Sequence, residues 1–120
     1  MRVTIVGVCA AGKSELARRL AARGLQVHPV AQEHSHVPEL WRHRGSPDVL
    51  IYLGASRRVV RRRGRLGMTA AELRDQRRRL AHARRHAQLR LQTDHLRPDE
   101  VEGAVLRYLA GQWSARYTAS

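Results

Sequence analysis

The sequence of 120 residues contains almost no cysteine, few aromatic side chains and no long apolar run. The single cysteine, Cys9, cannot form a disulfide within the chain, which fits a reducing compartment. No stretch is apolar over the roughly 20 residues that a membrane-spanning helix needs, and no signal peptide is evident. These absences argue against a disulfide scaffold and a membrane partner. We expect one modest domain in the cytoplasm.

Lysine is also nearly absent, since Lys13 is the only lysine among 23 basic residues. The net charge of +13 favours polyanionic partners such as nucleotides or nucleic acid. None of the few aromatic residues lies within the arginine runs, so base stacking by a single-strand binder is not indicated. Binding to a nucleic-acid backbone remains open from composition alone.

Residues 7–14, with the sequence GVCAAGKS, match the pattern G-x-x-x-x-G-K-S/T at every fixed position. Residues 2–6 form a β-branched run that predicts a buried strand, and residues 14–23 show a helical pattern that a glycine follows. A glycine-bounded loop between a strand and a helix is the setting in which this motif cradles nucleotide phosphates.

The residue types of the motif suit phosphate chemistry. Gly7 and Gly12 allow the main chain to approach an anion, and the first turn of the helix points N–H groups at it. We expect the Lys13 ammonium to reach the β- and γ-phosphates and the Ser14 hydroxyl to ligate Mg²⁺. The predicted nucleotide-binding residues of this loop are Gly7, Val8, Cys9, Ala10, Ala11, Gly12, Lys13, Ser14 and Glu15.

Strand-like and helix-like runs alternate along the remaining chain. The predicted strands are residues 25–30, 49–53 and 89–92, and the predicted helices are a short one from Pro38 and those at 56–63, 69–88 and 98–111. Thr69 and Glu72 form a capping box, and Pro98 suits the first turn of the last helix. This alternation predicts an α/β fold of three layers with a parallel sheet of about four strands. One domain at 1–111 would precede a polar tail at 112–120.

Taken together, these features resemble the P-loop kinases of the adenylate, thymidylate and shikimate kinase type. The resemblance rests on the motif at 7–14, on the strand that follows Pro47 and Asp48, and on residues 92–101, which look like the last strand, turn and helix of that group. The basic residues 57–88 stand where those kinases carry a lid. The resemblance implies a P-loop NTPase fold, ATP or another NTP, Mg²⁺, and a small hydroxyl or phosphate acceptor.

Two departures from this group are visible. Only residues 31–46 stand where the kinases have a further strand and a helical acceptor-binding region, and Gly54 replaces an aspartate that many of them carry. The chain therefore resembles a small, truncated member, and its acceptor is not defined by the sequence.

Phosphoryl transfer requires a carboxylate near the metal ion or the attacking hydroxyl. If the strand at 25–30 lies beside the strand at 2–6, Glu33 ends beside Ser14, where it could hold a metal-bound water or act as a base. An exposed loop glutamate is the alternative. Among the many arginines of the lid-like region we select Arg61, Arg77 and Arg84 as ligands for ATP phosphates.

Three functions remain open. The leading hypothesis is a small ATP-dependent phosphotransferase with Lys13 and Glu33 as catalytic residues, and with Ser14 and Glu33 at the metal. The short acceptor region and Gly54 favour a second hypothesis, a non-enzymatic or slow NTP-binding switch. In the third, less favoured one, the basic helices contact nucleic-acid phosphates. The sequence does not set the oligomeric state.

Overall fold

A computed structural model describes the backbone of residues 1–118 and the side chains of residues 1–112. The helices and strands are β1 (Arg2–Gly7), α1 (Lys13–Ala22), β2 (Gln26–Pro29), β3 (Val49–Gly54), α2 (Arg57–Arg62), α3 (Ala70–His86), β4 (Leu89–Gln92) and α4 (Pro98–Thr118). Two short 3-10 turns, η1 (Gln32–His34) and η2 (Leu40–Arg42), lie between β2 and β3. Within the described residues, no helix combines the length and the apolarity needed to cross a membrane.

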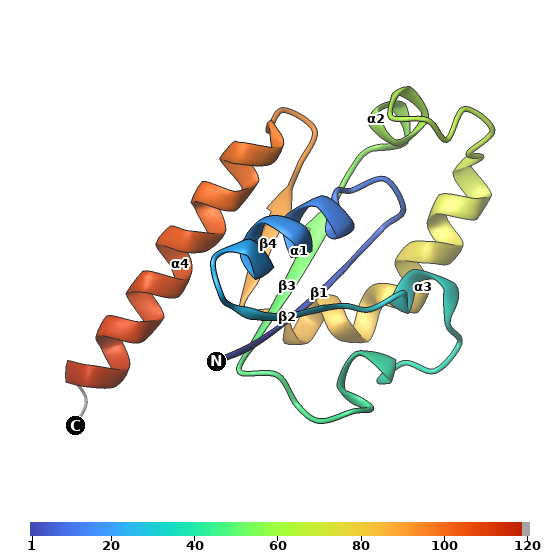
Figure 1. Cartoon of the computed structure of the whole chain (residues 1–120). Helices are drawn as coiled ribbons and strands as arrows, with labels where there is room; N and C mark the ends of the chain where they lie inside the picture. The colour runs from blue at the N-terminus through green and yellow to red at the C-terminus, as the bar shows by residue number, and fades with distance from the viewer. Residues whose placement is uncertain (119–120) are drawn as a thin grey trace.

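The four strands form one parallel sheet in the order β2-β1-β3-β4 (Figure 1). β1 lies inside the sheet, where Val3 pairs with Val27 on one side and with Val49 on the other. All six residues of β3 are buried, as expected for a parallel strand covered on both faces. The predicted α/β fold with a parallel sheet of four strands is therefore confirmed.

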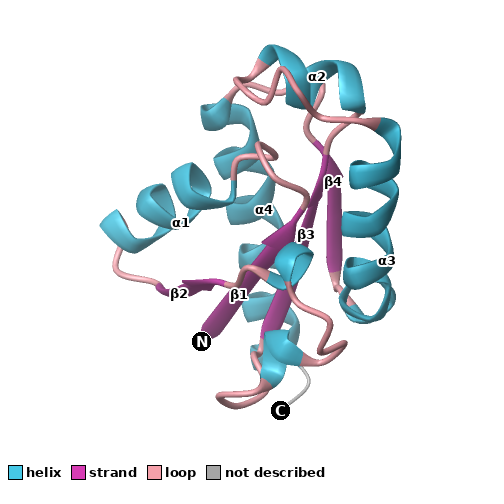
Figure 2. Cartoon of the chain, turned by 90° about the vertical axis from the view of Figure 1, so that its right-hand side faces the viewer, coloured by secondary structure: helices cyan, strands magenta, loops and turns pink. Residues whose placement is uncertain are grey.

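Helices cover both faces of the sheet (Figure 2). α1 and α4 lie together on one face, where Leu16 and Leu20 of α1 are buried. α3 lies on the other face, against β1 and β3, and buries Leu73 and Leu80. The sheet is thus the middle of three layers, and the carboxyl ends of its strands all open at one edge.

The predicted end of the last helix is wrong. α4 does not end at Gly111 but continues to Thr118. A glycine ends a helix readily when it adopts a left-handed conformation, but Gly111 is not among the glycines with positive φ. In a helical conformation it costs only about 1 kcal/mol relative to alanine. The side chains beyond Gln112 and the backbone of residues 119–120, part of the predicted tail, lie outside the described residues.

The helix predicted from Pro38 is reduced to the single turn η2. The buried carboxamide of Gln32 organises this segment instead, because it accepts a hydrogen bond from the Trp41 backbone N–H (2.9 Å) and donates to the Val37 carbonyl (2.7 Å). Trp41 is buried and donates through Nε1 to His82 Nδ1 of α3 (3.1 Å). The segment between β2 and β3 is therefore a structured loop attached to α3.

Candidate functional site

Residues 7–14 connect β1 to α1 in a tight loop. Gly7 has no room for a side chain, because a Cβ there would lie 2.3 Å from the Leu53 carbonyl oxygen of β3. Ala10 (φ 60°) and Gly12 (φ 102°) are both left-handed, which curls the main chain around the start of α1. Gly12 provides no side-chain cap for α1. The N–H groups of the first turn are consequently available to an external anion.

The Lys13 ammonium lies at the inner side of this loop, where all three of its N–H bonds have an acceptor. It donates to the Gly7 carbonyl (2.8 Å), the Val8 carbonyl (3.0 Å) and Glu33 Oε2 (2.6 Å). The Lys13 and Glu33 side chains are only 12% and 5% exposed. The predicted position of Glu33 near the loop is thus confirmed, because β2 pairs with β1 and delivers η1 to this side.

The second oxygen of Glu33 has no partner. Oε1 is the only buried polar side-chain atom without a hydrogen bond among the described residues. A buried carboxylate oxygen without a partner is costly unless a ligand, metal or water completes its contacts. This oxygen therefore marks a position where an additional group belongs.

α3 contacts the loop through Gln76, which sequence reasoning missed. Its buried side chain accepts a hydrogen bond from the Cys9 backbone N–H (3.0 Å) and donates to Cys9 Sγ (3.2 Å). Ala11 N donates to the Val8 carbonyl within the loop (3.2 Å). The signal was available, since Gln76 is a polar residue in the buried stripe that contains Leu73 and Leu80.

Two hollows flank the loop. The inner one measures about 310 Å³ and is lined by Lys13, Ser14, Glu33 and also by His34 and Arg65. It therefore holds every predicted catalytic and metal-binding residue, together with an arginine from the connection between α2 and α3.

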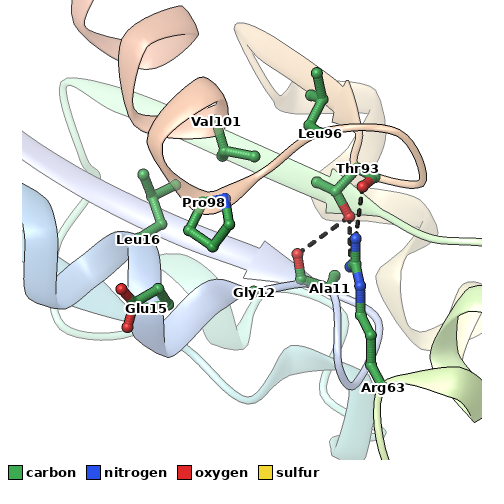
Figure 3. A pocket seen from close by; sticks show the side chains of 9 residues that line it. All are labelled: Ala11, Gly12, Glu15, Leu16, Arg63, Thr93, Leu96, Pro98 and Val101. Carbon is green, nitrogen blue, oxygen red and sulfur yellow. Dashed lines mark hydrogen bonds between the residues drawn. The ribbon is translucent and has the colours of Figure 1, made fainter.

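The outer hollow measures about 240 Å³ and lies beside Gly12 (Figure 3). Leu16, Leu96, Pro98 and Val101 supply apolar walls. Arg63 closes one side, because its guanidinium donates to the Thr93 hydroxyl (3.0 Å), the Thr93 carbonyl (2.6 Å) and the Ala10 carbonyl (3.1 Å). The walls suit a flat, largely apolar group, and the arginine offers a planar cation beside it.

The carboxyl ends of the strands meet at the loop, as predicted. Thr93, which follows β4, lies with its hydroxyl 3.2 Å from the Ala11 carbonyl and 3.0 Å from the Gly54 carbonyl. Asp94 accepts a hydrogen bond from the Ser56 N–H at the start of α2 (2.8 Å). Burial raises the pKa of Asp94, but the hydrogen bonds from Ser56 and Gln92 outweigh burial and hold this pKa below its usual value. Asp94 thus shapes the turn.

The three arginines selected as phosphate ligands do not line either hollow. Arg61 donates to the Leu66 carbonyl in the turn after its own helix (2.9 Å). Arg77 and Arg84 lie in a separate groove between α3 and β4. Arg63, the residue that follows the last turn of α2, is instead the arginine that contacts the loop. The sequence does not distinguish it from its neighbours, because the orientation of α2 in the fold determines which arginine faces the loop.

Glu15 lies in the first turn of α1 and lines the outer hollow. Hydrogen bonds from Arg18 and Arg19 lower the pKa of Glu15 to about 2. The Glu15 carboxylate is therefore ionised at neutral pH, and its oxygens accept hydrogen bonds from Arg18 and Arg19. The described residues contain no cluster of three or more histidine, cysteine or acidic side chains that could hold a metal by themselves. A hard cation here would need oxygens from a ligand in addition to Ser14.

No protein-family model matches the chain, and no curated protein matches it either. The interpretation of the site consequently rests on its geometry.

Proposed function

We propose that the protein binds a nucleoside triphosphate with Mg²⁺ at residues 7–14, has a fold of the P-loop NTPase type, and transfers the γ-phosphoryl group to a small acceptor. One observation carries the proposal. The Lys13 ammonium and the Glu33 carboxylate lie together at the inner side of a loop whose helix has no side-chain cap, and the second Glu33 oxygen has no partner among the described residues.

The nucleotide would occupy both hollows. The base would enter the outer hollow against Pro98, Leu96 and the Arg63 guanidinium, and the phosphates would follow the loop past Gly12. The γ-phosphoryl group would then reach the inner hollow, where Lys13 lies.

The Lys13 side chain has a role before and after the ligand arrives. Without ligand, two backbone carbonyls and Glu33 satisfy the ammonium. A phosphate would draw it away, because a doubly charged oxyanion is a stronger acceptor than two carbonyls. Glu33 would then be free to accept the proton of an attacking hydroxyl or to hold a metal-bound water. Mg²⁺, which the Ser14 hydroxyl and the phosphates would hold, would neutralise charge on the transferred group.

The acceptor would approach through the inner hollow, since this is where Glu33 and the γ-phosphoryl site meet. Arg65 and His34 line the same opening. At about 310 Å³ the hollow suits a small molecule. Assays of ATP turnover with a panel of hydroxyl and phosphate compounds would identify the acceptor.

A binding switch is the second candidate, because the loop is tied to α3 through Gln76 and to the turn after α2 through Arg63. Phosphates that compete for the Cys9 N–H would loosen α3 from the loop. Nucleotide binding would then change the position of α3 without any transfer.

Turnover of ATP with the acceptor panel separates the two candidates. For a kinase, Glu33→Gln should lower kcat by about 10²–10⁴-fold while the Kd for Mg–ATP changes only several-fold, because the carboxylate acts on the acceptor's proton. Glu39→Gln is the matched control, since Glu39 is an exposed carboxylate of the same segment. Binding without acceptor-stimulated ADP release would favour the switch, and equal kcat in wild type and Glu33→Gln would exclude Glu33 as the base.

A further inference from the structure

A basic groove lies between α3 and β4. α3 covers the face of the sheet opposite α1 and α4 (Figure 2). The groove measures about 690 Å³, and its polar lining comes from Arg77, Arg84, Arg85, Arg90, Tyr52 and Gln92. The groove forms where α3, which packs mainly on β1, β3 and η1, passes the edge strand β4. Arg90 and Gln92 are the exposed residues of β4, and Leu89 and Leu91, which alternate with them, are half-buried. The groove shares no lining residue with the hollows beside the loop.

The four arginines of the groove have no acidic partner in the part of the chain whose side chains are described. No carboxylate among the described residues lies within ion-pair distance of any of them. Carboxylates do pair with six arginines elsewhere, namely Arg18, Arg19, Arg23, Arg42, Arg78 and Arg97, and most of the other described arginines without such a pair also lie in residues 57–90. Four like charges in one concave surface repel each other unless an anion joins them.

Contacts within the groove hold the guanidinium groups in place without using up their donors. Arg90 Nε donates to the Arg84 carbonyl (2.9 Å), and Arg77 donates to the Ala55 carbonyl (3.3 Å). The Arg84 guanidinium lies over the Tyr52 ring, 5.7 Å from its centroid. Each guanidinium has five N–H donors, so most of them remain available to a ligand. This is the arrangement in which arginine binds phosphate through paired hydrogen bonds.

The positive charge extends beyond the groove. Residues 57–90 contain 13 arginines and only two acidic residues, a net of +11 out of +13 for the whole chain. These residues form α2, α3 and β4, which follow one another along one side of the molecule (Figure 2). A small anion would fill the groove and leave the remaining arginines without counter-charge. The extent of the charge therefore matches a long polyanion.

We infer that the groove between α3 and β4 is a docking site for the phosphate backbone of a nucleic acid. Binding is independent of base sequence, because no aromatic side chain of the groove is exposed for stacking and Tyr52 is only 8% exposed. Phosphates of the strand lie along α3 and pair with Arg84, Arg85 and Arg90, with Arg77 at the end nearer the strands' carboxyl ends. This activity is separate from nucleotide binding at residues 7–14.

The test measures binding of fluorescein-labelled oligonucleotides of about 15 nucleotides, single-stranded and duplex, by anisotropy at several salt concentrations. The groove variant is Arg84→Gln/Arg85→Gln, which keeps helix propensity and removes two charges. The matched control is Arg44→Gln/Arg107→Gln, which removes two charges from exposed arginines outside residues 57–90. Circular dichroism checks that all three proteins are folded.

We expect the groove variant to bind about tenfold or more weakly, with a salt slope smaller by about 1.4 for a single strand, because each lost phosphate contact reduces the slope by about 0.7. The control should stay within about twofold of wild type. Comparison of the single-strand and duplex arms identifies the preferred form, and oligo-dA and oligo-dT should bind alike.

Three results would overturn the inference. The first is equal weakening in both variants, which would indicate general charge attraction. The second is displacement of the oligonucleotide by saturating Mg–ATP, which would place it at residues 7–14. The third is equal affinity for inorganic tripolyphosphate and for the oligonucleotide, which would make the groove a small-anion site.

Discussion

Lys13 and Glu33 form a buried pair whose members depend on each other. Each would be costly alone, because a buried charge without its partner keeps its desolvation penalty. The pair also leaves one carboxylate oxygen unsatisfied, so it is not optimised for stability. Such a compromise is typical of residues held ready for a ligand.

Removal of one member of this pair tests how closely the two are coupled. Lys13→Met should lower the free energy of unfolding by about 3 kcal/mol, because Glu33 stays buried without its cation. Lys13→Met/Glu33→Gln should recover part of the loss, since a neutral amide needs no counter-charge. Urea denaturation at fixed ionic strength measures both. Full stability of Lys13→Met would show that Glu33 reaches water and that the pair is not coupled.

The sequence identified some site residues and missed others for a physical reason. The main-chain loop and Lys13 are local features, so their spacing alone predicts them. Glu33 required the assumption that β2 pairs with β1, which the structure confirms. Arg63 could not be separated from Arg61, because the choice depends on how α2 is oriented in the fold.

At the level of elements, α1 and α4 are joined by charges in addition to apolar contacts. Arg19 bridges Glu15 of its own helix (2.8 Å) and Glu102 of α4 (3.0 Å). Arg23 adds a second bond to Glu102 (2.7 Å). Glu15 also lines the outer hollow, so this network lies beside the hollow. The network therefore holds one wall of the proposed base site in position.

Acid should weaken this network. Hydrogen bonds from Arg18 and Arg19 hold the pKa of Glu15 at about 2, below the ordinary value of 4.5. A lowered folded-state pKa contributes stability above pH 4.5, and this contribution is lost as the pH falls from 4.5 towards 2. Glu15→Gln should therefore make unfolding less pH-dependent in that window, as followed by thermal melts at low salt.

Element identity was largely predictable, while some boundaries were not. β3, β4 and α3 were predicted because burial on both faces, short apolar alternation and the Thr69 cap each leave a local pattern. The ends that failed depend on tertiary context. Gly111 stays helical in the middle of α4, and the segment after Pro38 follows the buried carboxamide of Gln32 rather than its own helix propensity.

The whole molecule separates two kinds of surface. The edge where the strands' carboxyl ends meet carries the loop, Lys13 and Glu33, and most of the described arginines without a carboxylate partner lie in residues 57–90. Composition predicted a polyanionic partner but not this separation, because the strand order that puts β4 at the edge is a property of the assembled sheet. The two surfaces meet at α3, which contacts the loop through Gln76 and lines the basic groove with Arg77.

Isothermal titration calorimetry of Mg–ATP tests the central claim most directly, because it needs neither an acceptor nor turnover. We expect one molecule bound per chain, with affinity that falls when Mg²⁺ is chelated and is lost in Lys13→Ala. Arg44→Gln should bind as wild type does, which shows that the heat does not come from general charge attraction. Folded protein that gives no Mg–ATP heat, or Lys13→Ala that binds as tightly as wild type, would contradict nucleotide binding at residues 7–14.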